Sequence, residues 1–111
     1  MQSIGNFSLT NNAGEVVKLQ FVYWDAKGNK HHEDGTDGFP INQSRSRTPG
    51  ESGVPAGSTV SLYCFVVWGI DVTADQQFIY DPNSTSTASY SVTGTTLDSH
   101  LTLLGVNVGA N

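Results

Sequence analysis

The stretch EVVKLQFVYWD, residues 15–25, alternates side chains in a way that decides the fold class. One face of an extended chain here carries Val17, Leu19, Phe21 and Tyr23. The other face carries Lys18, Gln20, Val22 and Trp24. Because successive side chains of a strand point to opposite faces of its sheet, this period of two predicts a half-buried strand.

A second stretch, STVSLYCFVVWG at residues 58–69, has the same period, but both of its faces become apolar toward the end. This predicts either a central strand covered on both sides or a strand that contacts another copy of the chain. The single cysteine, Cys64, lies inside this run, and with no second cysteine it cannot form an internal disulfide. We therefore expect Cys64 to pack as a small hydrophobic residue.

Further apolar runs recur at intervals of roughly ten residues, separated by turn-forming segments. The predicted strands are residues 4–9, a short one near 39–47, QQFIYD, ASYSV and HLTLLGV. The segments between strands include NNAG, AKGN, TPGESGVPAG, DPNSTS and TGTT. The sequence predicts an all-β fold, a single β-sandwich domain over residues 1–111 with seven or eight mostly antiparallel strands.

The amino-acid composition limits the classes of binding partner that we expect. Ten acidic and five basic side chains give a formal charge of −5, and no Lys or Arg follows Arg47. Sequence-independent nucleic-acid binding depends on cations that neutralise phosphates, so we expect no nucleic-acid partner.

The N-terminal segment lacks the pattern of a signal peptide, and no apolar run is long enough to cross a bilayer. These features predict a cytoplasmic or non-classically released protein without a transmembrane segment.

The segment HHEDGTDG, residues 31–38, concentrates ionisable groups. Adjacent residues of a strand face apart, so His31 and His32 would not chelate one ion together. His31 with Glu33, or His32 with Asp34, supplies two ligands where tetrahedral zinc needs three or four. More distant ligands could come from Asp98 and His100.

Calcium is the other candidate ion, because Asp34 and Asp37 lie among glycines. Their spacing lacks the acidic positions of an EF-hand loop. A solvated hairpin end with local turns is therefore favoured, and no cofactor is expected. A Ca²⁺ or Zn²⁺ site is the less favoured alternative, with candidate ligands His31, Glu33, Asp34 and Asp37.

No motif for nucleophilic, phosphate-transfer or paired-carboxylate chemistry occurs, so we expect a protein that is not an enzyme.

Arg45 and Arg47 would project from one face of an extended chain about 6.5–7 Å apart. They could grip a phosphate, sulfate or carboxylate, or they could be charges that protect an edge strand. Trp24 and Trp68 each end a predicted strand and run into a loop, where an indole suits a sugar platform, a lipid-interface anchor or the end of the core.

The order of segments VVKLQFVYWDAKGNKHH, GFPINQSRSRTPGESGVPAGSTVSLYC, FIYD and ASYSVTGTTL resembles the small aegerolysin-like β-sandwich proteins across most of the chain. The resemblance implies a compact, acidic domain without catalytic residues that binds a specific membrane lipid, in some members together with a larger pore-forming partner. This chain is shorter and lacks the family's multiple cysteines. We therefore assign no binding residue of this chain from the resemblance.

The sequence favours a non-enzymatic recognition module that binds a glycan or a membrane-lipid headgroup through loops at one end. The candidate ligand-binding residues are Trp24, Arg45, Arg47 and Trp68. The alternative is a structural or self-assembling protein that forms a homo-oligomer through the two-faced apolar strand. Metal-dependent chemistry at residues 31–37 is the third hypothesis.

Overall fold

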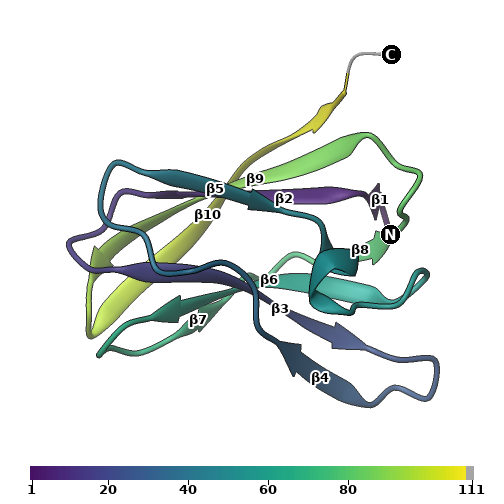
Figure 1. Ribbon diagram of the computed structural model, residues 1–111, viewed down its shortest axis with the longest axis horizontal. Coiled ribbons are helices and arrows are strands. Elements are labelled where there is room, and N and C mark those ends of the chain that lie inside the picture. Colours follow the sequence, from purple (N-terminus) through teal and green to yellow (C-terminus); the bar gives the residue numbers. More distant parts are fainter. Residues whose placement is uncertain (110–111) are drawn as a thin grey trace.

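The computed structural model describes residues 1–109 and consists of two β-sheets that pack face to face (Figure 1). Its strands are β1 (Ser3–Ile4), β2 (Asn6–Asn11), β3 (Val17–Trp24), β4 (Lys30–Glu33), β5 (Ser44–Arg47), β6 (Thr59–Val66), β7 (Val72–Thr73), β8 (Phe78–Tyr80), β9 (Ser86–Thr95) and β10 (Asp98–Val108). A 3-10 turn, η1 (Pro49–Ser52), lies between β5 and β6. The predicted all-β sandwich is confirmed.

One sheet has the order β1-β8-β6-β3-β4, with β7 also paired to β6, and the other has the order β10-β9-β2-β5. Most neighbouring strands are antiparallel, while β1 pairs with β8 and β2 with β9 in parallel. The pairing of β3 with β6 is antiparallel over eight residue pairs, from Val17 opposite Val66 to Trp24 opposite Thr59. The two strands therefore end at opposite ends of the sandwich.

The core lies between the sheets, and the ring of Phe7 in β2 is fully buried in it. This ring contacts Phe21 and Phe78 of the opposite sheet edge-on, with centroid distances of 5.5 and 5.8 Å. Within its own sheet it stacks on Tyr90 at 6.4 Å. Edge-to-face pairs of this kind add to the burial of apolar surface. Aromatic side chains thus join the two sheets.

Strand β6 is central in its sheet, as its two apolar faces predict. Its inward face is buried, and Cys64 on that face is fully inaccessible, so burial raises the pKa of its thiol to about 12. On the outer face, the ring of His32 lies 4.2 Å from that of Tyr63. The ammonium group of Lys18 lies 5.4 Å from the ring of Phe65. Side chains from neighbouring strands of the same sheet therefore cover part of the outer face of β6.

Residues 30–33 form a strand, β4, where the sequence favoured a solvated hairpin end. The reason is the tight turn before them. The Asp25 carboxylate oxygen Oδ1 accepts the backbone N–H groups of Lys27 and Asn29 at 2.9 and 3.0 Å. Because this closes the turn within five residues, β4 can pair with the whole second half of β3. Only the acidic and glycine-rich part that follows remains a loop.

Removing the Phe7 ring is expected to destabilise the whole domain. A Phe7→Ala variant leaves a cavity between the sheets, and such substitutions cost about 3–5 kcal/mol. Urea denaturation followed by circular dichroism measures the loss. Phe65→Ala is the matched control, because that ring is partly exposed on the outer face, and it should cost clearly less. Equal losses for the two variants would contradict the central role of Phe7.

Candidate functional site

The two tryptophans lie at opposite ends of the sandwich. Trp24 is the last residue of β3, and Trp68 follows β6, which runs antiparallel to β3. The length of β3 alone separates them by about 23 Å, from a rise of about 3.3 Å per residue. This corrects the expectation that loops at one end bring both tryptophans and both arginines together. The pairing of β3 with β6 is the physical reason.

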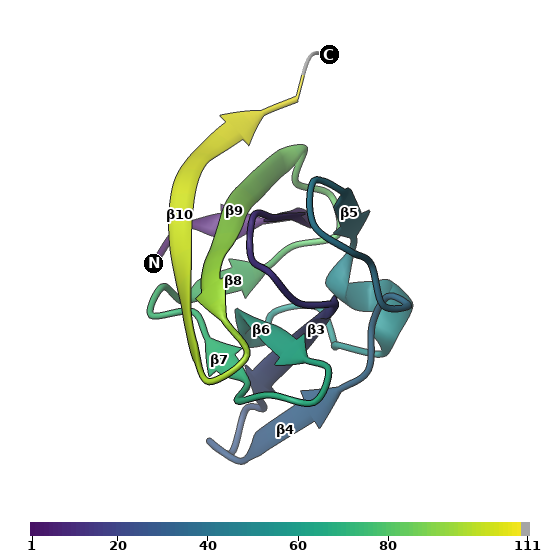
Figure 2. The same ribbon diagram turned by 90° about the vertical axis from the view of Figure 1, so that its left-hand side faces the viewer.

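The end that carries Trp68 has five exposed apolar side chains, which are together named here the apolar tip. It consists of Val16, Ile41, Trp68, Ile70 and Leu97. These residues come from four loops that meet at the left-hand end of Figure 1, the end that faces the viewer in Figure 2. Trp68 is the most prominent, because 96% of its surface is exposed. Sequence reasoning singled out Trp68 and missed the four aliphatic residues.

Backbone hydrogen bonds hold the four loops of the apolar tip against one another. The N–H of Val67 donates to the carbonyl of Val16 at 3.0 Å, which joins the β6–β7 loop to the β2–β3 loop. The N–H of Ile70 donates to the carbonyl of Thr96 at 2.7 Å, which joins it to the β9–β10 turn. The N–H of Asn42 bonds to the end of β2 at 2.7 Å. The exposed side chains therefore stand on a fixed base.

Asp71 closes the loop that presents Trp68. Its Oδ1 accepts the backbone N–H of Val66 at 2.8 Å, and the hydroxyl of Tyr63 donates to its other oxygen. Burial, the hydrogen bond and the negative charge of Asp71 raise the pKa of Tyr63 to about 12. Trp68 itself has a φ of 59°, in the left-handed region that side chains rarely adopt. The loop thus holds the indole outward at a cost in backbone strain.

Glu15 lies at the base of the apolar tip and is almost fully buried. Its Oε1 accepts the hydroxyl of Ser99 at 2.6 Å, and its backbone carbonyl accepts the side-chain amide of Asn11 at 2.7 Å. The second carboxylate oxygen, Oε2, is buried and has no hydrogen-bond partner within residues 1–109. Glu15 therefore links the β2–β3 loop to the start of β10 beneath the exposed side chains.

Arg45 and Arg47 project from one face of β5, as predicted, and β5 is an edge strand. Their guanidinium groups are engaged by nearby residues of the same chain. Arg45 donates to the side chain of Gln43 at 2.8 Å and lies 5.1 Å from the ring of Phe39. Arg47 donates to the hydroxyl of Ser52 at 2.6 Å. The arrangement fits charges that protect a sheet edge better than an open anion fork.

His31 and His32 face apart, as the strand geometry predicts. The His31 ring stacks on Tyr23 at 4.6 Å and its Nε2 lies 2.9 Å from the Asp25 carboxylate. The His32 ring lies on the other face, with its Nε2 2.7 Å from Oε1 of Gln20. These contacts hold both histidines within the β3–β4 sheet.

The structure does not gather the predicted metal ligands His31, Glu33, Asp34 and Asp37 around one point. Within the part of the chain that the structure describes, no group of three or more His, Cys, Asp or Glu side chains could hold a metal ion. His100, considered as a distant ligand, lies 3.2 Å from Asp98 on β10. Within residues 1–109, the histidine and acidic side chains therefore form no such group for calcium or zinc.

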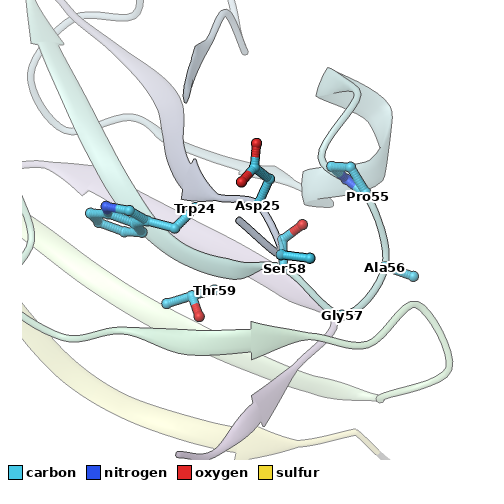
Figure 3. Close-up of a pocket in the computed structure, with 8 residues that line it drawn as sticks. Trp24, Asp25, Pro55, Ala56, Gly57, Ser58 and Thr59 are labelled. Carbon is cyan, nitrogen blue, oxygen red and sulfur yellow. The ribbon is translucent and has the colours of Figure 1, made fainter. Parts of the chain in front are cut away.

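At the end opposite the apolar tip, Trp24 lines a hollow of about 360 Å³ (Figure 3). The hollow lies between the end of β3 and the loop that leads into β6. Its walls are formed by Trp24, Asp25, Ala26, Pro55, Ala56, Gly57, Ser58 and Thr59. The sandwich thus has an apolar surface at one end and a concave, mixed surface at the other.

No protein-family model and no curated protein sequence matches the chain. Solved structures with some likeness include listeriolysin O, with 16% identity and a TM-score of 0.49 over 96% of this chain and 22% of that protein. The membrane-binding domain of pneumolysin gives 11% identity and a TM-score of 0.42 over 96% of this chain and 98% of that domain. A non-hemolytic pneumolysin from Streptococcus pneumoniae gives 12% identity and a TM-score of 0.42 over 96% of this chain and 24% of that protein.

These identities and TM-scores are too low to assign a family or a function. The chain spans 22% of the length of listeriolysin O and 23% of that of pneumolysin. The resemblance to aegerolysin-like proteins stays a prediction. No helix within the described residues is long and apolar enough to cross a membrane.

Burial of the Tyr63 ring, together with its contact with Asp71, predicts that this phenol ionises late. The pKa of Tyr63 is raised from 10.0 to about 12, and that of Tyr90 also to about 12. The raised values stabilise the folded state below pH 10, and this contribution is lost as pH rises from about 10 to about 12. In Tyr63→Phe, the late phase of phenolate absorbance should shrink by about half, because one of two late phenols is gone. An unchanged late phase would contradict the raised pKa of Tyr63.

Proposed function

We propose that the protein is a non-enzymatic membrane-binding module that inserts its apolar tip into the lipid interface. The observation that carries this proposal is the convergence of the five exposed apolar side chains of the tip at one end. Monomeric soluble domains rarely gather such side chains, and contiguous exposed patches mark membrane or protein contacts. The predicted recognition of lipid through end loops is thereby narrowed to one end of the sandwich.

The chemistry of the apolar tip favours lipid over a glycan as its ligand. Val16, Ile70 and Leu97 offer no hydrogen-bond donor or acceptor to sugar hydroxyl groups. An indole suits the membrane interface, because its ring is apolar and its N–H can stay near water. Exposed aliphatic side chains at the same end as an exposed tryptophan therefore suit insertion at the boundary between lipid headgroups and acyl chains.

The apolar surface is large enough to give measurable binding. Burial of one side chain of this size contributes roughly 1.5–3 kcal/mol. Immersing Trp68, Ile70 and Leu97 together contributes at most roughly 4.5–9 kcal/mol, because Ile70 and Leu97 are already partly buried, and this gain offsets the cost of association. The fixed base of the tip reduces the ordering cost that mobile loops would add.

Charge indicates which membranes the tip suits. The loops that carry the five side chains contain no Lys or Arg, and the chain has a formal charge of −5. Attraction to anionic lipids depends on basic residues near the surface. We therefore expect binding to zwitterionic membranes, with little dependence on salt because apolar burial drives it.

Co-sedimentation with zwitterionic phosphatidylcholine vesicles tests the proposal. Trp68→Ala should weaken partitioning about tenfold or more, and Ile70→Asp should weaken it further by placing a charge at the interface. Leu104→Asp is the matched control, because Leu104 is 64% exposed on β10 but lies outside the apolar tip. Its partitioning should equal that of the wild-type protein.

Two results would contradict the proposal. The first is no sedimentation of the wild-type protein with any vesicle, and the second is equal loss in the Leu104 and Trp68 variants. Light scattering without lipid distinguishes the alternative, a homo-oligomer. If the wild-type protein is an oligomer and Trp68→Ala is a monomer, the tip joins copies of the chain and the membrane proposal fails.

A further inference from the structure

We propose that the hollow beside Trp24 binds a carbohydrate, with one pyranose ring seated between the end of β3 and the loop that enters β6. This is a second site, at the end of the sandwich opposite the apolar tip. It does not depend on the membrane proposal. Its volume of about 360 Å³ falls at the lower end of the range of small-ligand sites, which suits one sugar ring.

The two walls of the hollow come from segments far apart in the sequence (Figure 3). The first wall is the end of β3, with Trp24 and Asp25. The second is the loop from Pro55 to Thr59. Trp24 and Thr59 are paired residues on neighbouring strands, so their side chains lie on the same face of the sheet. An aromatic ring and a hydroxyl group are thus held side by side by the strand register.

Hydrogen bonds within the fold make both walls rigid. The backbone N–H of Gly57 donates to the carbonyl of Tyr80 at 2.8 Å, and the N–H of Ser58 donates to that of Pro55 at 3.2 Å. Gly57 has a φ of 85°, which a residue with a side chain would resist. Asp25 closes the opposite turn, as described above. A site that is already formed loses little conformational entropy on binding.

The side chains in the hollow match the two surfaces of a sugar. The C–H face of a pyranose is apolar and can pack on the half-buried indole of Trp24. Sugar hydroxyl groups can exchange hydrogen bonds with the hydroxyl of Thr59. They can also donate to Oδ2 of Asp25, which has one partner, His31, whereas Oδ1 is occupied by the backbone N–H groups of Lys27 and Asn29. The hydrogen bond from His31 and those from the turn hold the pKa of Asp25 below its ordinary value, so the carboxylate is an acceptor at neutral pH.

Two other ligand classes fit the hollow less well. A quaternary ammonium group stacked on Trp24 would be repelled by the positive charge of Lys30, whose ammonium group lies 5.9 Å from the ring centroid, whereas an uncharged sugar would not. An acyl chain would need a continuous apolar lining, and the hollow combines one indole with a carboxylate and two hydroxyl groups. The mixed lining is the arrangement that sugar recognition requires.

The test uses the Trp68→Phe protein, in which Trp24 is the only tryptophan. Its fluorescence is titrated with a panel of methyl pyranosides, including gluco, galacto, manno and N-acetylated members, and with choline as the cationic probe. We expect a saturable change with at least one pyranoside and none with choline. The signal reports on the hollow directly.

Variants then assign the binding by calorimetry with the same pyranoside. Trp24→Ala should weaken binding about tenfold or more. Thr59→Val, which keeps the shape of the side chain and removes its hydroxyl, should weaken it about threefold or more. Trp68→Ala removes the same residue type at the other end and should bind like the wild type. Circular dichroism confirms that each variant is folded.

The proposal is overturned if no pyranoside changes the Trp24 fluorescence, or if choline alone does. It is also overturned if a pyranoside binds and Thr59→Val and Trp24→Ala retain full affinity. Because Thr59→Val is a conservative change on a strand, it decides the question even if Trp24→Ala fails to fold. Vesicle binding is expected to survive Trp24→Ala, which separates the two sites.

Discussion

The antiparallel pairing of β3 with β6 sets the register of the larger sheet and the positions of both tryptophans. Each strand alternates a core-facing row with an outer row, and their eight residue pairs set the register of the larger sheet. Phe21 in the core-facing row of β3 packs against the Phe7 ring of the opposite sheet, as does Phe78 of β8. Because a tryptophan stands at the C-terminal end of β3 and just beyond that of β6, antiparallel pairing places Trp24 and Trp68 at opposite ends. One hydrogen-bonded ladder thus builds the core and separates two surfaces.

These two surfaces differ in chemistry although each is built around a tryptophan. At the apolar tip, exposed aliphatic side chains lie at the same end of the sandwich as a highly exposed indole, and backbone hydrogen bonds hold the loops that carry them. Beside Trp24, a half-buried indole shares a hollow with a carboxylate and hydroxyl groups. Removal of apolar side chains from water favours insertion of the apolar tip into lipid. Hydrogen bonds to the polar groups of the hollow favour binding of a hydroxylated ligand there. A module bound to a membrane by its tip would present the hollow away from the bilayer.

The strands with a period of two could be predicted from the sequence, because a strand that buries one face has an apolar residue at every second position. Strand β4 could not, since its residues KHHE carry no apolar alternation and it forms because Asp25 closes the preceding turn. Of the apolar tip, only Trp68 was recognisable. Ile70 and Leu97 are isolated apolar residues in turn-rich loops, and they become neighbours through the bond from Ile70 to Thr96. The separation of the tryptophans likewise required strand pairing, which no local pattern encodes.

The most direct test of the membrane proposal is the depth of the Trp68 indole when the protein meets a bilayer. In a Trp24→Phe protein, Trp68 is the only tryptophan, and its fluorescence is measured with zwitterionic vesicles whose acyl chains carry bromine as a quencher. The proposal predicts a blue shift of the emission and strong quenching by bromine near the interface, because the exposed indole moves from water into lipid. Co-sedimentation with no shift and no quenching would contradict it, because the protein would then bind the membrane through another surface.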